Sequence, residues 1–331
     1  MEKVYIIVLN YNNWKDTICC LESLLSLDYN NFQIILVDNF STDNSVEKIL
    51  SWANNEITVE LSDFYLNKIK KFSIDKTLEI IDLNNFKFSN SKILLLKNNK
   101  NNGYAAGNNI GINYAKFCND FEYLWILNND VFVENTSLSF LVEKSKKNKD
   151  TLLGNKIFFF YEPNVLQTIG IGYHNYLMAF SWLVTNTYGS FKTIFLNILK
   201  SFFCFKFVYG ASVFFSKELI SKLNYKFTED YFLYFEEQDT AIQLLNKGCN
   251  IDTCEEAVIY HKSGNTINSN RSNKKSTFVD YYFNRNKILF TQKYFPKVLF
   301  VVKIFVFITA IRRCVQGYKN NAIQILKVIG F

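Results

Sequence analysis

Asp130 is the residue of this sequence that is best placed to bind a metal ion. It follows the apolar run 123–127, which we expect to be a buried strand, after Asn128 and Asn129. A carboxylate at a strand end is held rigidly, and Mg²⁺ or Mn²⁺ prefers oxygen ligands and fills its shell with water or phosphate. The pattern predicts a divalent-cation site shared with a substrate diphosphate. The structural alternative is a cap for a helix after Thr136.

Three carboxylates, Glu236, Glu237 and Asp239, follow the aromatic pair Tyr234 and Phe235. Burial beside aromatic rings and mutual repulsion would raise the pKa of one of them, as a general base requires. Acidic residues are also common in the first turn of a helix, where the dipole stabilises them. Alone, this segment does not decide between the two roles.

His261 ends the apolar stretch 258–260, and the chain has only 2 histidines. A neutral imidazole at a strand end can complete a metal shell. A structural histidine is the alternative.

Polar side chains follow the first two expected strands, 4–9 and 32–37, and ligands bind outside the carboxyl ends of parallel strands. Asp38 or Asn39 could hydrogen-bond the edge of a base, and an aromatic ring could stack on it. Turn formation and helix capping explain the same residue types. The candidates are Tyr11, Asn12, Asp38, Asn39 and Asp43.

A loop rich in small residues, 102–111, follows the third expected strand, 93–96. Its glycines, Gly103 and Gly107, would let backbone amides approach an anion, and the helix expected from Asn108 would favour negative charge at its start. The loop matches neither a dinucleotide-binding fingerprint nor a Walker loop. A dehydrogenase or P-loop enzyme is therefore disfavoured.

Strands alternating with helices over the first 130 residues predict a doubly wound, mostly parallel α/β sheet. Residues 52–92 interrupt the alternation, and we expect an inserted hairpin and loop there because apolar residues alternate at 57, 59 and 61. Further on we expect a strand at 208–215, a helix at 237–246, and two short strands at 251–253 and 258–260.

Composition narrows the class of protein further. The net charge is +7, but Lys is dispersed and Arg is scarce, which does not fit a nucleic-acid binder. The 7 cysteines form no CxxC spacing and no secretory signal opens the chain, so we expect reduced thiols in a cytoplasmic protein. Attraction to anionic lipid or to a phosphorylated substrate fits the charge.

The C-terminal region, 288–331, is apolar and basic. Residues 298–311 are apolar except for Lys303, and Arg312 and Arg313 follow. The run is shorter than the ~20 residues of a membrane span, so we expect an amphipathic helix on the inner face of the cell membrane. Packing into the core or into a homodimer is the alternative.

Together these segments resemble the family-two glycosyltransferases of the GT-A fold, and most closely the rhamnosyltransferase-like enzymes of bacterial surface polysaccharides. The resemblance covers roughly residues 3–290 apart from the insertion. Each motif is modest, but their order and spacing are specific. The matching motifs are Asn10-Tyr11-Asn12, the run 37–43, the run 101–111, Leu127 to Asp130, Gly210-Ala211, the run 232–239, His261 and Arg285-Asn286.

The resemblance implies an inverting, metal-dependent transferase that uses Mg²⁺ or Mn²⁺ and a UDP-, dTDP- or GDP-linked sugar. The acceptor would be a glycan or a polyprenyl-diphosphate-linked oligosaccharide. It implies a domain at 1–287, with a nucleotide-binding half at 1–130 and an acceptor half at 131–287. The implied metal contacts are Asp130 and His261, and the implied base is Glu237, with Asp239 as a second candidate. Tyr104, Asn108 and Asn129 join the nucleotide site, and Gly210, Ala211, Glu236 and Arg285 the acceptor and diphosphate side.

Two departures from the family pattern keep other functions open. Asn128 stands at the first position of the metal motif, and Glu237 stands where the family has Asp. A non-catalytic, sugar-nucleotide-binding relative is one alternative. A sugar-phosphate nucleotidyltransferase is another, although the loop after the first strand, Asn10 to Lys15, lacks the glycines of that class.

Overall fold

A computed structural model describes residues 1–69, 75–185, 203–262 and 276–330. Its centre is a sheet of ten strands. In sheet order these are β3 (Leu78–Ile81), β4 (Ile93–Lys97), β2 (Phe32–Asp38), β1 (Val4–Asn10), β5 (Tyr123–Asn128), β12 (Ser212–Ser216), β7 (Thr151–Phe159), β13 (Asn250–His261) and β6 (Val131–Val133), with β8 (Leu166–Thr168) beside β7. The first five of these run parallel to one another, which confirms the predicted α/β sheet.

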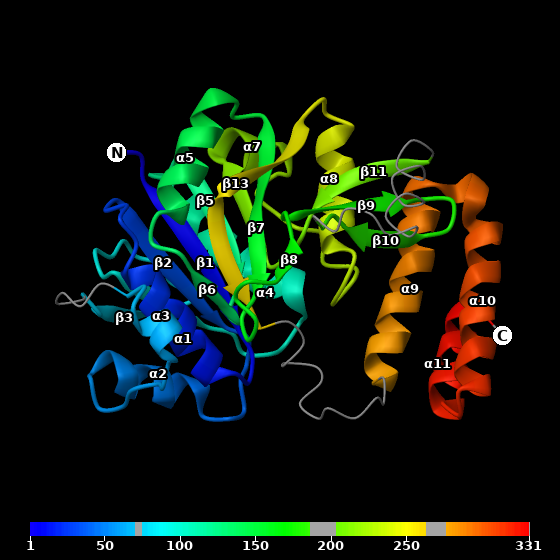
Figure 1. Cartoon of the computed structure of the whole chain (residues 1–331), viewed down its shortest axis with the longest axis horizontal. Coiled ribbons are helices and arrows are strands. Elements are labelled where there is room, and N and C mark those ends of the chain that lie inside the picture. The colour runs from blue at the N-terminus through cyan, green and yellow to red at the C-terminus, as the bar shows by residue number, and fades with distance from the viewer. Residues whose placement is uncertain (70–74, 186–202, 263–275, 331) are drawn as a thin grey trace.

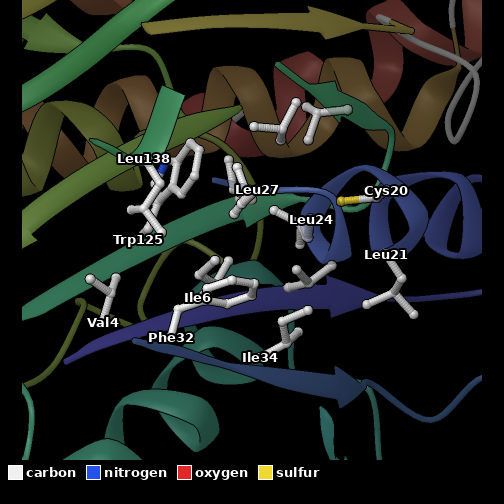
Figure 2. Packing of buried hydrophobic residues seen from close by; sticks show 14 of the residues in the cluster. Val4, Ile6, Cys20, Leu21, Leu24, Leu27, Phe32, Ile34, Trp125 and Leu138 are labelled. Atoms are coloured by element: carbon white, nitrogen blue, oxygen red, sulfur yellow. The ribbon is translucent and has the colours of Figure 1, made fainter. Parts of the chain in front are cut away.

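Helices cover both faces of this sheet (Figure 1). Those of the sheet domain are α1 (Trp14–Leu25), α2 (Ser45–Ala53), α3 (Asp63–Leu66), α4 (Tyr104–Cys118), α5 (Ser137–Lys147), α7 (Lys217–Lys222) and α8 (Glu236–Leu245). Side chains alternate along the strands, so β1 buries Ile6 against α1 on one face and Ile7 on the face of α4. Figure 2 shows Leu21 and Leu24 of α1 in the same buried cluster as Ile6 of β1 and Trp125 of β5.

The second half of the chain completes the fold with antiparallel pairs. β12 runs antiparallel to both β5 and β7, while β13 lies parallel to β7. A separate antiparallel sheet has the order β10 (Phe180–Leu183), β9 (Ile171–Asn175), β11 (Cys204–Val208), and it contacts α8 through β11.

Three helices end the described chain: α9 (Thr277–Tyr294), α10 (Leu299–Val315) and α11 (Lys319–Ile329), with the short 3₁₀ turn η1 (Pro296–Val298) before α10. A buried ion pair ties them together. The guanidinium of Arg313 donates from Nε and Nη2 to the carboxylate of Asp280, at 2.7 and 2.9 Å, and Asn321 donates to the same carboxylate at 2.8 Å. No helix of the described residues is both long and apolar enough to cross a membrane.

The structure corrects four of the predicted elements. The boundary expected at residue 288, between the transferase domain and the C-terminal region, is wrong because residue 288 lies inside α9. The sequence pattern did not reveal the start of α9 because its buried residues Asn284 and Asn286 are polar and interrupt the apolar periodicity. The hairpin at 52–92 is also wrong: the described part holds the end of α2, α3 and the edge strand β3, which lies parallel to β4. Ile57 and Val59 alternate because they pack against the core beside α2, without a strand partner.

The other two corrections concern strands. The strand expected at 208–215 is the end of β11 and the whole of β12, separated by a turn at Gly210. The two short strands expected at 251–253 and 258–260 are one strand, β13, with a bulge between Cys254 and Val258. No disulfide bond is present among the described residues.

Candidate active site

The carboxyl ends of β1, β2 and β5 lie side by side and form what we call the donor edge. Asn10 pairs with Asp38 across β1 and β2, and Leu9 pairs with Asn128 across β1 and β5. The carboxylate of Asp38 accepts hydrogen bonds from Asn10 Nδ2 at 2.8 Å and from Ser41 Oγ at 2.6 Å. The structure therefore brings together the strand ends that the sequence singled out.

Side-chain amides fix the loops of the donor edge. Asn129 Nδ2 lies 2.9 Å from Thr17 Oγ1 and 3.2 Å from Asn10 Oδ1, so Asn129 supports the first loop instead of facing outward. Asn12 accepts from the amide of Thr42 at 2.6 Å, and Asp43 accepts from the amide of Ser45 at 3.1 Å. Among the predicted nucleotide residues, Tyr11 has an exposed ring, at 38%.

The glycine-rich loop is held against the acceptor half. Gly103 has φ of +94°, and a Cβ there would lie 2.1 Å from the carbonyl oxygen of Phe232. The next amide, of Tyr104, donates to that carbonyl at 2.7 Å. The helix starts at Tyr104, so the expectation of a helix N-terminus at Asn108 is wrong. Asn108 is buried in the second turn and donates to the carbonyl of Tyr104.

Gly107 and Asn39 meet beside this loop. A Cβ on Gly107 would lie 2.5 Å from Leu9 Cδ1 and 3.3 Å from Asn39 Cγ. Asn39 Nδ2 donates to Asn101 Oδ1 at 3.0 Å and accepts at Oδ1 from Asn98 at 2.9 Å. Next to Asn98 the surface has a hollow of about 510 Å³, lined by residues of β3, the end of β4 and α4. A nucleotide could therefore contact this edge at a preformed surface.

Asp130 and His261 come together at the ends of β5 and β13, although 130 residues separate them in the sequence. His261 Nε2 lies 3.2 Å from Asp130 Oδ1, and both side chains are about 95% buried. That oxygen has no hydrogen bond within the described residues. Burial alone would raise the pKa of Asp130, but the charge of a protonated His261 beside it outweighs burial and lowers the pKa.

This pair fits a divalent cation. His261 Nδ1 lies 3.1 Å from Gln167 Oε1, so Gln167 orients the ring and Nε2 points toward the carboxylate of Asp130. Two acceptors at that distance need a positive charge between them, which either a proton or a metal supplies. Within the described residues no third His, Cys, Asp or Glu joins them. A bound metal would take its remaining ligands from water and diphosphate.

Glu237, in the first turn of α8, contacts the turn at Gly210. A Cβ on Gly210 would lie 2.2 Å from Glu237 Oε1, so a larger residue at this position would displace the carboxylate. Burial raises the pKa of Glu237, and hydrogen bonds from its own amide and from that of Gly210 only partly offset the rise. Burial first, and then the charge of Glu237, raise the pKa of Glu236 well above its usual value. A carboxyl group with a raised pKa is suited to accept a proton near neutral pH.

The turn at Gly210–Ala211 joins the two halves of the site. Tyr104 donates from its hydroxyl to the Gly210 carbonyl at 3.0 Å, and the amide of Asn128 donates to the Ala211 carbonyl at 3.1 Å. Burial chiefly, and then the charge of Glu237, raise the pKa of Tyr104. The predicted residues of the diphosphate and acceptor sides are therefore neighbours in space.

Asp239 has a different environment from Glu237, two residues earlier. It is 1% exposed, and four of its contacts are of ordinary length: Thr228 Oγ1 at 2.7 Å, Tyr231 hydroxyl at 2.7 Å, Lys293 Nζ at 2.8 Å and Tyr294 hydroxyl at 2.9 Å. Gln243 also donates to it. A carboxylate with five donors is an anchor between α8 and α9 and has no free lone pair aimed at a substrate.

Residues 230–237, which we call the base segment, lead into α8 in a strained conformation. Phe232, Tyr234 and Phe235 have φ of +63°, +72° and +79°, a region that bulky L-residues rarely occupy. Asn286 of α9 is fully buried, and its Nδ2 lies 2.7–3.0 Å from the carbonyls of Tyr231, Leu233 and Tyr234. Arg285 donates to the Asp230 carbonyl at 3.0 Å, so it too holds this segment.

Three supporting residues were missed by the sequence reasoning: Gln167, Tyr209 and Asn286. Gln167 orients His261, and the ring of Tyr209 lies edge-on to it at 5.8 Å between centroids. Asn286 was noted only as part of a motif. A polar residue inside an apolar helix is a usable signal for a buried contact, but nothing in the sequence names its partner.

The comparisons with known proteins place this geometry in a family. The sequence profile of Glycosyl transferase family 2 matches residues 5–64 and 69–207. The chain belongs to that family. The curated Glycosyltransferase GlyG of Streptococcus pneumoniae serotype 4 is 27% identical over 155 residues, which are 46% of this chain and 39% of that protein. The matched region thus spans about two fifths of that relative.

Solved structures show the same fold. The mannosyltransferase PcManGT from Pyrobaculum calidifontis, in complex with GDP-Man and Mn²⁺, has a TM-score of 0.52 and 14% identity, covering 98% of this chain and 74% of that one. S. aureus TarS 1–349 in complex with UDP-GlcNAc has a TM-score of 0.51 and 14% identity, with 87% and 66% covered. The predicted GT-A fold and family are thereby confirmed.

Proposed function

We propose that this protein is an inverting glycosyltransferase that moves a sugar from a nucleoside diphosphate to a hydroxyl of a glycan or lipid-linked oligosaccharide, in the synthesis of a surface polysaccharide. The observation that carries the proposal is Glu237, a carboxylate of raised pKa that is seated against Gly210. The Gly210 turn also contacts Tyr104 of the glycine-rich loop. The fold neighbours that were solved with UDP-GlcNAc and with GDP-Man support a sugar-nucleotide donor.

In this mechanism Glu237 accepts the proton of the acceptor hydroxyl. The hydroxyl oxygen forms a bond to the anomeric carbon from the face opposite the diphosphate, and the bond from that carbon to the diphosphate oxygen breaks with its electron pair. The nucleoside diphosphate leaves, and the configuration at the sugar inverts. Asp239 anchors α8, and Asn286 holds the base segment, so that Glu237 meets the acceptor in one orientation.

Asp130 and His261 are the residues that would hold Mg²⁺ or Mn²⁺. When bound, the ion neutralises negative charge on the diphosphate. Asp130 stays ionised because its pKa is lowered, and Gln167 keeps the imidazole turned toward it. Tyr11, Asp38 and Asn39 would contact the nucleoside, and the hollow beside Asn98 offers room for part of the donor.

Turnover of a panel of UDP-, dTDP- and GDP-sugars tests the enzyme directly. Glu237→Gln should lower kcat by roughly a hundred- to ten-thousand-fold, because a positioned general base contributes that much. Glu143→Gln, on the exposed face of α5, is the matched control and should keep full activity. Because the pKa of Glu237 is raised, the acidic limb of the pH–rate profile should lie above the ordinary glutamate range. Full activity both in EDTA and in Glu237→Gln would refute the mechanism.

Calorimetry separates an enzyme from a non-catalytic relative. With one carboxylate and one imidazole, the bare protein should bind Mn²⁺ weakly, and UDP should increase the affinity by providing phosphate oxygens. Asp130→Asn should abolish that increase. Tight Mn²⁺ binding without nucleotide, or UDP binding whose affinity does not depend on Mn²⁺, would contradict the proposed role of Asp130 and His261 as metal ligands.

We propose that the protein works as a peripheral protein on the inner face of the cell membrane, where a polyprenyl-linked acceptor would be found. The C-terminal helices α10 and α11 are apolar and basic, which supports this location. We further propose that the chain divides into a donor half at 1–130 and an acceptor half from 131 onward, and that the C-terminal helical region starts at α9.

A further inference from the structure

The outward face of α10 carries one continuous apolar stripe. Its members recur at intervals of four, four, three and four residues, which places them on one side of a helix. They are Phe300, Ile304, Ile308, Ile311 and Val315, and we call them the α10 stripe. Their exposed fractions run from 43% to 84%. Figure 1 shows α10 and α11 at the end of the molecule away from the main sheet, beyond α9.

The opposite face of α10 already makes the packing contacts of the helix. Val302, Val306 and Ala310 are buried against Ile325 of α11 and Ile288 of α9. The residues of the α10 stripe therefore remain exposed after the opposite face of the helix has been packed. An apolar patch of this kind on an otherwise polar surface marks a site of association.

The charge around the α10 stripe indicates what it associates with. Nine of the 37 Lys and Arg residues lie after residue 280, and this last part of the chain has no Asp or Glu. The first 280 residues therefore hold 28 basic and 30 acidic residues. The net charge is thus +9 for residues 281–331 and −2 for residues 1–280. Lys297, Arg312, Lys319 and Lys327 are exposed there.

A second copy of the chain is a poor occupant for such a surface. Two stripes facing each other would bring together two regions of net positive charge, and like charges across an interface oppose association. An anionic bilayer fits both features, because acyl chains receive the apolar side chains while lipid phosphates lie beside the Lys and Arg residues.

We propose that the α10 stripe is a membrane-contact surface, with α10 lying flat on a bilayer that contains anionic lipid. This proposal rests on the proposed membrane location and names the surface that makes the contact. It does not depend on the proposed sugar transfer, because the α10 stripe is separate from the active site.

The position of α9 relates this surface to the active site. Asn286 of α9 hydrogen-bonds the carbonyls of the base segment, and Ile288, two residues later, packs against α10. One helix therefore separates the lipid-contact face from the residues that precede Glu237. An acceptor with a lipid anchor would approach the acceptor half from the side that faces the bilayer.

Vesicle flotation with the full chain tests the surface. The unaltered protein should float with vesicles rich in phosphatidylglycerol, less so at high salt, and remain unbound with phosphatidylcholine alone. Ile304→Ser/Ile308→Ser should lower the bound fraction by about tenfold or more, because the loss of buried apolar groups weakens interfacial binding. Phe88→Ser/Val165→Ser, which removes exposed apolar side chains far from α10, is the matched control and should bind like the unaltered protein.

A second measurement keeps the result interpretable if the double variant is unstable. Phe300→Trp should be quenched by brominated acyl chains in anionic vesicles more strongly than the native tryptophans are. Absent binding of the unaltered protein, unchanged binding of the stripe variant, or a dimer that the stripe variant disperses would each overturn the proposal. Hydrolysis of the donor in solution should be normal in the stripe variant, so failure here is distinguishable from failure of the proposed transferase.

Discussion

The donor edge and the base segment both contribute to the site, but they differ in how many of their aromatic residues have positive φ. At the donor edge Asp38 and Asn129 are hydrogen-bonded by neighbouring side chains, and one aromatic residue of its loops, Phe40, has a positive φ. In the base segment, aromatic residues have positive φ, and Glu236 Oε1 is buried without a hydrogen bond within the described residues. Strain and unpaired groups persist only when surrounding contacts impose them. We infer that contacts with α9, together with the anchor Asp239, hold the proposed base Glu237 in place.

The largest expected effect comes from removing the anchor. Asp239→Ala leaves the hydroxyls of Thr228, Tyr231 and Tyr294 without their acceptor, and the free energy of unfolding should fall by about 3 kcal/mol or more. The ion pair with Lys293 adds little, because the lysine side chain is 40% exposed. Urea denaturation measures the change. If Asp239→Ala were as stable as Glu143→Ala, Asp239 would not be an anchor.

Gly210→Ala tests the contact between the two halves. A Cβ 2.2 Å from Glu237 Oε1 must displace the carboxylate, and misplacing a catalytic group by about 1 Å costs on the order of 100-fold in rate. Steady-state kinetics should show the loss mainly in kcat. Gly248→Ala is the control: its φ is +75° and the space around it is open, so it should lose stability and keep activity. Equal kinetic effects from both would exclude the proposed contact.

Asn286→Ala tests whether the base segment keeps its conformation without the hydrogen bonds from Asn286 to its carbonyls. Releasing the carbonyls of Tyr231, Leu233 and Tyr234 should lower kcat by about tenfold, with the KM for the donor unchanged, because the donor edge is untouched. Asn284→Ala is the matched control, since Asn284 is also buried on α9 but donates only to the carbonyl of Asp280. A rise in donor KM, or equal losses in both variants, would show that α9 acts on the whole site.

The smallest expected effect is a gain in stability. The pKa of Glu236 is raised by burial, so the folded protein binds its proton more tightly than the unfolded chain does. Stability from this group is present at low pH and is lost as the pH rises through the raised pKa. Glu236→Gln should therefore raise the melting temperature at neutral pH, by an amount that corresponds to about 1 kcal/mol, and change it little in acid. An equal change at both pH values would contradict this assignment.

The two regions also differ in how well the sequence predicted them. The donor edge follows from local patterns, because each polar cluster stands directly after an apolar strand such as 4–9 or 32–37. Asp130 and His261 were predicted as partners, and they lie 3.2 Å apart. Their roles as ligands, and the role of Glu237 as base, stay predictions.

The base segment could not be predicted in the same way. Its conformation depends on Asn286, more than fifty residues later, and aromatic residues give no local signal for positive φ. The expected hairpin at 52–92 failed for a related reason, since alternation at Ile57 and Val59 reports burial and says nothing about a strand partner.

The ion pair between Asp280 and Arg313 couples folding of the active site to formation of the proposed membrane-contact surface. Because it ties α10 and α11 to the first turn of α9, the proposed anchor cannot form without the helix that holds the base segment. A chain that fails to fold around α9 would lose its proposed docking surface together with its active site. Recruitment to the membrane would then select for folded molecules, and trimming of the C-terminus by a protease would inactivate the protein as well as release it.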